Sequence, residues 1–253
     1  MRYLAWVDGR VVEAAELRHD QPFVMQRVHT LGYCAFFLDH HLKLLRLASE
    51  ELFGFASLCS VADAEDIIAM LLDRSRMTKT LSVPVAIRIN GRGELSLEVE
   101  TPTFGTGIYL RAKRFEAVVA DTIIPSTTVQ TSVSVALDAL NDRRVQMFGG
   151  DKAIWIDAAY NLISRPWLPI FVVHRDRVYT PVEHRSVEYL VAKRAIERAG
   201  LHLEVRSIPA GSLEQLDEIF VVDIMSISAF SSIGNHRLLS TISQRIANKM
   251  ELF

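Results

Sequence analysis

The sequence predicts an α+β protein with two domains. Segments with the period of strands and segments with the period of helices are mixed in both halves of the 253-residue chain. Near the middle, Pro125 and a neighbouring Ser-Thr-Thr run indicate a connection rather than a regular element. We therefore expect an N-terminal domain at 1–114, a connection at 115–128 and a C-terminal domain at 129–253.

The N-terminal domain is predicted to be built from hairpins and two helices. Asp8-Gly9 is the strongest short hairpin signal and divides Leu4–Val12 into two strands. His40–Phe53 has an apolar face at helical spacing, and Ser60 is a typical N-cap for a second helix. The remaining predicted strands are Phe23–Val28, Ala35–Leu38, Val83–Asn90, Glu94–Glu100 and an edge strand at Phe104–Arg114. In Leu95–Val99 polar and apolar residues alternate, as on a sheet with one wet face.

The C-terminal domain is predicted to begin with a long helix. Val133–Phe148 is followed by Gly149-Gly150, a common C-terminal stop. Ser186–Ala199 forms the next predicted helix, and Asn235 is expected to cap a closing helix that runs to Met250. The predicted strands are Ala153–Ile156, Ile170–Val173, Val178–Thr180, His202–Val205 and Ile219–Val222.

Composition excludes several classes of function. Lys+Arg 28 against Asp+Glu 30 leaves a net charge of -2, whereas nucleic-acid binding needs clustered positive charge. No apolar stretch is long enough to span a bilayer, and Asp8 and Glu13 interrupt any N-terminal signal peptide. Cys34 and Cys59 form neither a disulfide framework nor, with the nearby histidines, a zinc pattern. We expect a cytoplasmic protein without nucleic-acid, membrane or metal partners.

Four stretches, taken in order and spacing, carry a resemblance to a known family. They are Phe23–Phe53, Gln130–Asp157, Arg177–Pro181 (RVYTP) and Leu213–Val222 (LEQLDEIFVV). Together they resemble the class IV pyridoxal-phosphate enzymes of fold type IV, which include branched-chain and D-amino-acid aminotransferases and aminodeoxychorismate lyase. The resemblance implies the two-domain class IV aminotransferase-like fold, a homodimer, and a ligand cleft between the domains.

The chemistry of that family depends on a lysine that this chain lacks at the corresponding place. No lysine occurs between Lys113 and Lys152, and the family position falls on Gln130 or Thr131. A Schiff base needs an amine, which neither side chain has. Lys152 occupies the family's acidic position beside a strand, so we expect it to be a surface residue that faces away from the cleft.

The other positions that the resemblance assigns to the cofactor have also changed. Ser164 or Arg165 stands in place of the glutamate that keeps the pyridine nitrogen protonated, and an arginine there would disfavour protonation. Of the phosphate-binding parts, Leu44 replaces an arginine, and Asp223-Ile224 replaces a pair that usually bears Ser or Thr. The segment Ser186-Val187-Glu188 replaces a glycine-led helix start, where Glu188 would repel phosphate if it faced the site.

Two hypotheses remain open at this level. The first is a class IV-like protein that does not transaminate, binds no cofactor, and uses its cleft for a small anionic ligand or a partner, or serves as a scaffold. We assign it no catalytic residue, because Ser132 has no evident base, and we place Thr131, Ser132, Arg165 and Ser186 in the cleft. The alternative is an active pyridoxal-phosphate-dependent aminotransferase or an aminodeoxychorismate-lyase-like enzyme.

Overall fold

The computed structural model describes residues 2–56, 59–102, 110–111, 115–121 and 127–250. The chain forms two compact units, of which the first takes 1–108 and 127–133 and the second takes 109–126 and 134–252. Both strands and helices occur in each unit, so the α+β prediction is confirmed. No helix among the described residues is long and apolar enough to cross a bilayer.

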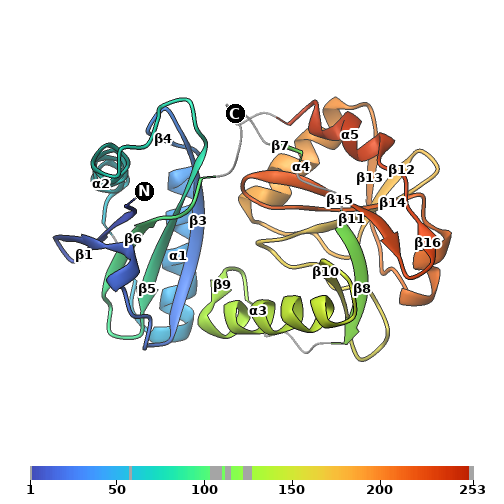
Figure 1. The fold of residues 1–253 in the computed structure, drawn as a ribbon, viewed down its shortest axis with the longest axis horizontal. Helices are drawn as coiled ribbons and strands as arrows, with labels where there is room; N and C mark the ends of the chain where they lie inside the picture. Colours follow the sequence, from blue (N-terminus) through green and yellow to red (C-terminus); the bar gives the residue numbers. More distant parts are fainter. Residues whose placement is uncertain (1, 57–58, 103–109, 112–114, 122–126, 251–253) are drawn as a thin grey trace. The chain divides into compact units, whose positions relative to one another are not determined.

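The first unit contains a seven-stranded antiparallel sheet covered by two helices. The sheet consists of β1 (Leu4–Val7), β2 (Arg10–Glu13), β3 (Phe23–Leu31), β4 (Cys34–Ala35), β5 (Val83–Asn90), β6 (Leu95–Val99) and β9 (Gln130–Thr131). Its order is β2-β1-β6-β5-β3-β4, with β9 beside β3. Helices α1 (Leu38–Phe53) and α2 (Val61–Arg74) pack on one face of this sheet (Figure 1).

Local sequence signals explain most of this unit. Asp8 (φ 41°) and Gly9 (φ 90°) both adopt the left-handed conformation that a two-residue hairpin turn requires, so the predicted hairpin is confirmed. Ser60 caps α2 in a capping box with Asp63, as predicted. Alternate residues of β5, including Ile87, face the helices in one apolar core, and the residues between them, including Arg88, lie on the other face of the sheet.

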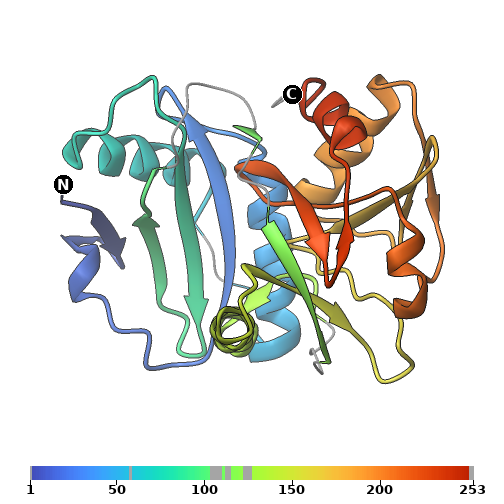
Figure 2. The ribbon, with the colours of Figure 1, turned by 45° about the vertical axis from the view of Figure 1, so that its right-hand side comes forward.

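The second unit is built on a nine-stranded mixed sheet. The strands are β7 (Leu110–Arg111), β8 (Phe115–Asp121), β10 (Lys152–Ile156), β11 (Ile170–His174), β12 (Arg177–Thr180), β13 (His202–Val205), β14 (Glu218–Val222), β15 (Ser226–Ile233) and β16 (His236–Arg237). The main order is β10-β8-β15-β14-β11-β12-β13, and β7 and β16 pair with β15. Helices α4 (Val187–Arg198) and α5 (Thr241–Ala247) lie side by side in both views (Figures 1 and 2).

Helix α3 (Ser132–Met147) starts directly after β9 and ends before Gly149, which has φ 79°. The helix and its glycine stop therefore agree with the prediction for Val133–Phe148. Val145 of α3 packs with Ala153 and Trp155 of β10 in a small core of the second unit. These contacts place α3 beside β10, so that Asp138 of the helix reaches Arg165 in the segment between β10 and β11.

The predicted connection at 115–128 is wrong over much of its length. Phe115–Asp121 forms β8, which lies parallel to β10 and also pairs with β15. Thr127–Val133 belongs to the first unit, because β9 pairs with β3, so the second domain does not start at 129. The turn residues near Pro125 indicated a connection, whereas β8 is stabilised by pairing with β10 and β15, which are distant in sequence. The edge strand predicted at Phe104–Arg114 lies outside the described residues except for β7, which belongs to the second sheet.

The predicted closing helix at Asn235–Met250 is also wrong in its first half. Gly234-Asn235 is a two-residue turn between β15 and β16, in which Ile233 pairs with His236. Gly-Asn between strands is itself a hairpin signal, and Asn235 lies in this turn instead of capping a helix. The helix starts only at Thr241, and the carboxylate of Glu218 accepts the N–H groups of Ile242 and Ser243 at 2.6 and 2.8 Å.

Candidate functional site

Thr131 and Ser132 lie in the first unit, at the junction of β9 and α3. Thr131 is buried and stands opposite Val24 of β3 in the antiparallel register. The Ser132 hydroxyl accepts a hydrogen bond from the Phe23 N–H at 3.5 Å. Both predicted ligand residues therefore take part in joining β9 to the edge of β3.

Arg165 lies in the second unit in a largely buried position. Its guanidinium donates to the Asp138 carboxylate of α3 and lies 4.1 Å from the ring centroid of Trp155. The same carboxylate accepts a hydrogen bond from Trp167 Nε1 at 3.2 Å. Burial lowers the pKa of the Arg165 guanidinium, and the nearby carboxylates of Asp138 and Asp142 oppose that shift. The charge of Arg165 is thus balanced within the unit.

Ser186 is the N-cap of α4, and the structure brings it next to Arg165 in the fold. Its hydroxyl accepts the Tyr189 N–H at 3.3 Å and donates to the Pro166 carbonyl at 2.5 Å. Glu188 is buried in the first turn of the same helix. A carboxylate there complements the helix dipole and would repel an incoming anion. The helix start that the resemblance assigns to phosphate therefore already carries a negative side chain.

Ser164 and His184 form a hydrogen-bonded pair that the sequence analysis did not identify. His184 Nε2 lies 2.9 Å from the Ser164 hydroxyl, which also accepts the Ile170 N–H at 3.2 Å. Burial lowers the pKa of His184 to about 4, so the ring is neutral at pH 7. The pair holds the segment around Arg165, between β10 and β11, in place. Ser164 and His184 are 20 positions apart, so no short sequence motif contains both.

Asp223 fills an anion-accepting turn with its own side chain. Its half-buried carboxylate accepts the N–H groups of Met225 and Ser226, each at 2.7 Å. Burial raises the pKa of Asp223, and these two backbone hydrogen bonds oppose the shift. Leu44, at the other phosphate position that the resemblance implies, is buried in the apolar core of the first unit. Neither residue offers a positive or neutral donor to an anion.

The chain has six lysines, five of them within the described residues. Lys43, Lys79 and Lys249 are exposed. Lys152 and Lys193 are half-buried and form ion pairs with Asp142 at 2.7 Å and with Glu183 at 3.0 Å. None of these five amines is buried in an apolar environment, the setting that activates a lysine for Schiff-base chemistry.

A charged network on the helix-free face of the first sheet was not foreseen. Arg88 pairs with Glu98 and lies 3.6 Å from Glu100, which in turn accepts from Arg27 at 2.8 Å. His19 extends the chain of charges, with its Nε2 3.5 Å from a Glu98 oxygen. The polar–apolar alternation of β6 was the available signal, because it places Glu98 on the face away from the helices.

Solved structures establish the fold. The branched-chain aminotransferase of the archaeon Thermoproteus uzoniensis, solved with norvaline, is similar with a TM-score of 0.79 and 19% identity over 99% of this chain and 94% of that chain. An aminotransferase from Brucella abortus bound to PLP gives a TM-score of 0.80 and 14% identity, covering 98% of both chains. The fold IV transaminase CpuTA1 from Curtobacterium pusillum gives 0.77 and 13%, over 100% and 99%.

This protein therefore has the class IV aminotransferase fold, as the four sequence stretches predicted. No family model matches the sequence, and no curated protein sequence matches it significantly. At this level of identity the shared property is the fold, whereas function depends on the residues of the site.

Proposed function

We propose that this protein is a non-transaminating member of the class IV fold that binds a small anionic molecule or a partner protein without forming a Schiff base. In this proposal it is cytoplasmic and acts as a homodimer, the assembly expected from the resemblance. Pyridoxal phosphate has no covalent role in it. The position of the described lysines carries the proposal.

A Schiff-base lysine needs a neutral amine close to the cofactor aldehyde. The described lysines either face solvent or hold a carboxylate, as Lys152 does with Asp142 at 2.7 Å. The residues at the family position, Gln130 and Thr131, are instead used in β9 and have no amine that could form an imine. Lys113 lies outside the described residues.

The other cofactor positions point the same way. A cofactor ring next to Arg165 would meet a cation instead of a proton acceptor, so the ring nitrogen would lose its protonated form. A phosphate would meet the carboxylate of Glu188, which is buried at the start of α4, and the half-buried carboxylate of Asp223 at the late turn. These residues do not fit pyridoxal phosphate, so we derive no step through it.

Binding of an anion at Arg165 requires competition with Asp138, since the two side chains form a buried ion pair. Such a pair favours a ligand that displaces the Asp138 carboxylate with a bidentate carboxylate of its own. Ser186 and Ser164 would add hydroxyl groups from the same corner of the second unit.

The decisive experiment is incubation of the purified protein with pyridoxal phosphate, followed by absorbance spectroscopy and borohydride reduction. We expect no imine band and no covalent adduct by mass spectrometry. The PLP-binding aminotransferase of Brucella abortus, treated identically, is the positive control.

An imine band that borohydride abolishes would overturn the proposal. The variants Lys113→Met and Lys152→Met would then locate the amine, since these residues flank the gap in the sequence. Loss of the band in only one variant would identify the lysine and favour the aminotransferase or lyase alternative.

A further inference from the structure

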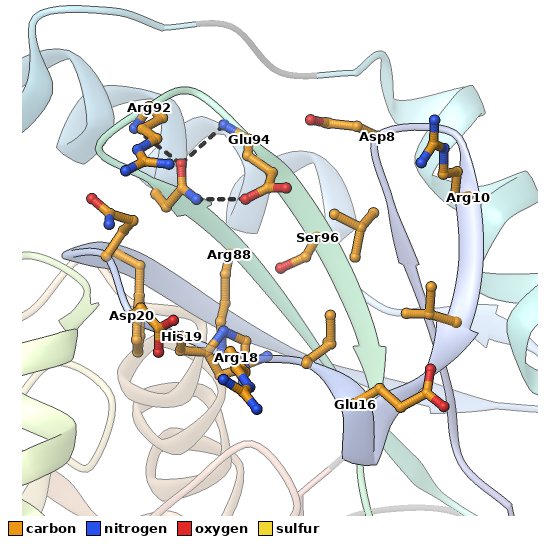
Figure 3. Close-up of a pocket in the computed structure, with 16 residues that line it drawn as sticks. Asp8, Arg10, Glu16, Arg18, His19, Asp20, Arg88, Arg92, Glu94 and Ser96 are labelled. Atoms are coloured by element: carbon orange, nitrogen blue, oxygen red, sulfur yellow. Dashed lines mark hydrogen bonds between the residues drawn. The ribbon is translucent and has the colours of Figure 1, made fainter.

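The first unit contains a pocket of about 670 Å³ on the helix-free side of its sheet. The β1–β2 hairpin, the segment from Glu16 to Gln21, and strands β5 and β6 enclose it (Figure 3). This volume falls in the range of small-molecule sites, which is about 300–1,000 Å³. All of its lining residues belong to the described part of the first unit.

The lining of the pocket combines apolar and charged side chains. Val7, Val12, Leu17 and Phe23 supply the apolar side chains. The lining also carries four arginines and four carboxylates, which are Arg10, Arg18, Arg88, Arg92, Asp8, Glu16, Asp20 and Glu94. With equal numbers of both signs, such a lining offers partners to a molecule that carries both charges, and it gives a purely anionic molecule repulsion as well as attraction.

Several of these charges have no partner of their own. Among the described residues, the side chains of Arg10, Arg18 and Glu16 form no hydrogen bond or ion pair with another residue. Other charges of the lining are engaged: Asp8 accepts the Leu95 N–H at 3.2 Å, and Glu94 accepts from the Asn90 amide at 2.8 Å. The unengaged groups are therefore available to a ligand of either sign.

Arg88 provides an independent observation. It is only 8% exposed, lines the pocket from β5, and pairs with Glu98, yet its Nε has no hydrogen-bond partner. A buried guanidinium with an unused donor is costly unless another group satisfies it. In Figure 3, Arg18 and Arg88 lie on one side of the pocket and Glu16 lies on the other.

We infer that this pocket binds a small zwitterionic molecule, a short peptide or a free amino acid, with its carboxylate toward Arg18 and Arg88 and its ammonium toward Glu16. The apolar side chains of the lining receive the uncharged part of the molecule. This site goes beyond the proposed function, because it lies in the first unit and involves none of Thr131, Ser132, Arg165 and Ser186.

Three matched probes test the inference by calorimetry on the full chain: dialanine, N-acetyl-dialanine, which lacks the ammonium, and dialanine amide, which lacks the carboxylate. A hydrogen bond to a charged group is worth enough to make dialanine bind about tenfold more tightly than either blocked peptide. Backbone amide signals of Glu16–Gln21 and of β5 should shift on binding in NMR spectra.

Single charge removals identify the orientation. Arg18→Gln should weaken the binding of dialanine about tenfold and leave the binding of dialanine amide unchanged. Glu16→Gln should also weaken the binding of dialanine about tenfold, but it should leave the binding of N-acetyl-dialanine unchanged. Both residues are exposed, so the variants should fold. Arg46→Gln, an exposed arginine on α1, is the matched control and should change nothing.

Equal affinity for all three peptides would overturn the inference, as would stronger binding of the acetylated peptide. Absence of binding at millimolar dialanine would also overturn the inference. This holds even if binding is absent because a second copy of the chain covers the pocket, an association that sedimentation would reveal. The outcome is separate from the borohydride test, because no imine is involved in this site.

Discussion

Asp138 of α3 and Arg165, which follows β10, are 27 residues apart and form a largely buried ion pair. Trp155 lies under the guanidinium and Trp167 donates to the same carboxylate. The pair therefore lies at the centre of a small polar cluster between α3 and the segment that connects β10 to β11. It also balances the charge of the one residue that the sequence analysis offered as the cation of the site.

Asp138→Asn should destabilise the second unit. The change leaves the Arg165 guanidinium buried without an opposite charge, and the free energy of unfolding should fall by about 3 kcal/mol. Urea unfolding followed by tryptophan fluorescence is the measurement, since Trp155 and Trp167 contact the pair.

The control for Asp138→Asn is Glu183→Gln, which removes the partner of Lys193 in an exposed pair. Exposed pairs contribute little, so we expect a loss below about 1 kcal/mol. Equal effects of the two changes would mean that burial does not govern the Arg165 pair.

Glu218→Ala should loosen helix α5. The Glu218 carboxylate is buried and accepts two N–H groups of the first turn, from Ile242 and Ser243. Their loss should cost about 2 kcal/mol, and hydrogen exchange of those two amides should accelerate. Glu214→Ala, at an exposed position nearby, is the control and should leave both exchange rates as they are. Unchanged exchange in Glu218→Ala would contradict the capping role.

Stability should decrease as the pH falls below about 6.5 because His41 is buried in its neutral form. Burial lowers the pKa of His41 to about 3, and its Nδ1 lies 2.7 Å from Gln26 Oε1. The unfolded chain binds a proton at its ordinary pKa of about 6.5, while the folded chain does not bind it until near pH 3. Between these values the residue should cost about 1.4 kcal/mol of stability per pH unit.

His41→Asn keeps an amide group near Gln26 and removes the titration. Its unfolding free energy should therefore depend less steeply on pH between 6.5 and 4 than that of the parent chain, measured by urea unfolding at several pH values. His184, whose pKa is lowered to about 4, retains its own contribution in this variant. Parallel curves for the two proteins would show that His41 titrates normally.

Ser60→Ala should destabilise α2 by about 1 kcal/mol. The Ser60 hydroxyl accepts the Asp63 N–H at 3.1 Å and donates to the Asp63 carboxylate at 2.6 Å. Thermal unfolding monitored by circular dichroism would measure the loss. Ser60→Asn retains an N-cap acceptor and should restore most of the stability, whereas an equally unstable Asn variant would rule out capping as the cause.

The sequence alone determined the elements whose signals are local. The turn at Asp8-Gly9, the cap at Ser60 and the glycine stop after α3 all depend on residues within a few positions of each other. The resemblance of four stretches added the fold. The absence of lysine between Lys113 and Lys152 was equally visible in the sequence.

Only the tertiary structure decided the rest, because the partners are distant in sequence. Strand β8 exists through pairing with β10 and β15, and α5 starts where Glu218 reaches its first turn. The neutralisation of Arg165 by Asp138 likewise needs α3 to pack against β10. Pairing between residues distant in sequence fixes the positions of these strands and charged side chains, because a buried backbone group or charge is stable only beside its partner.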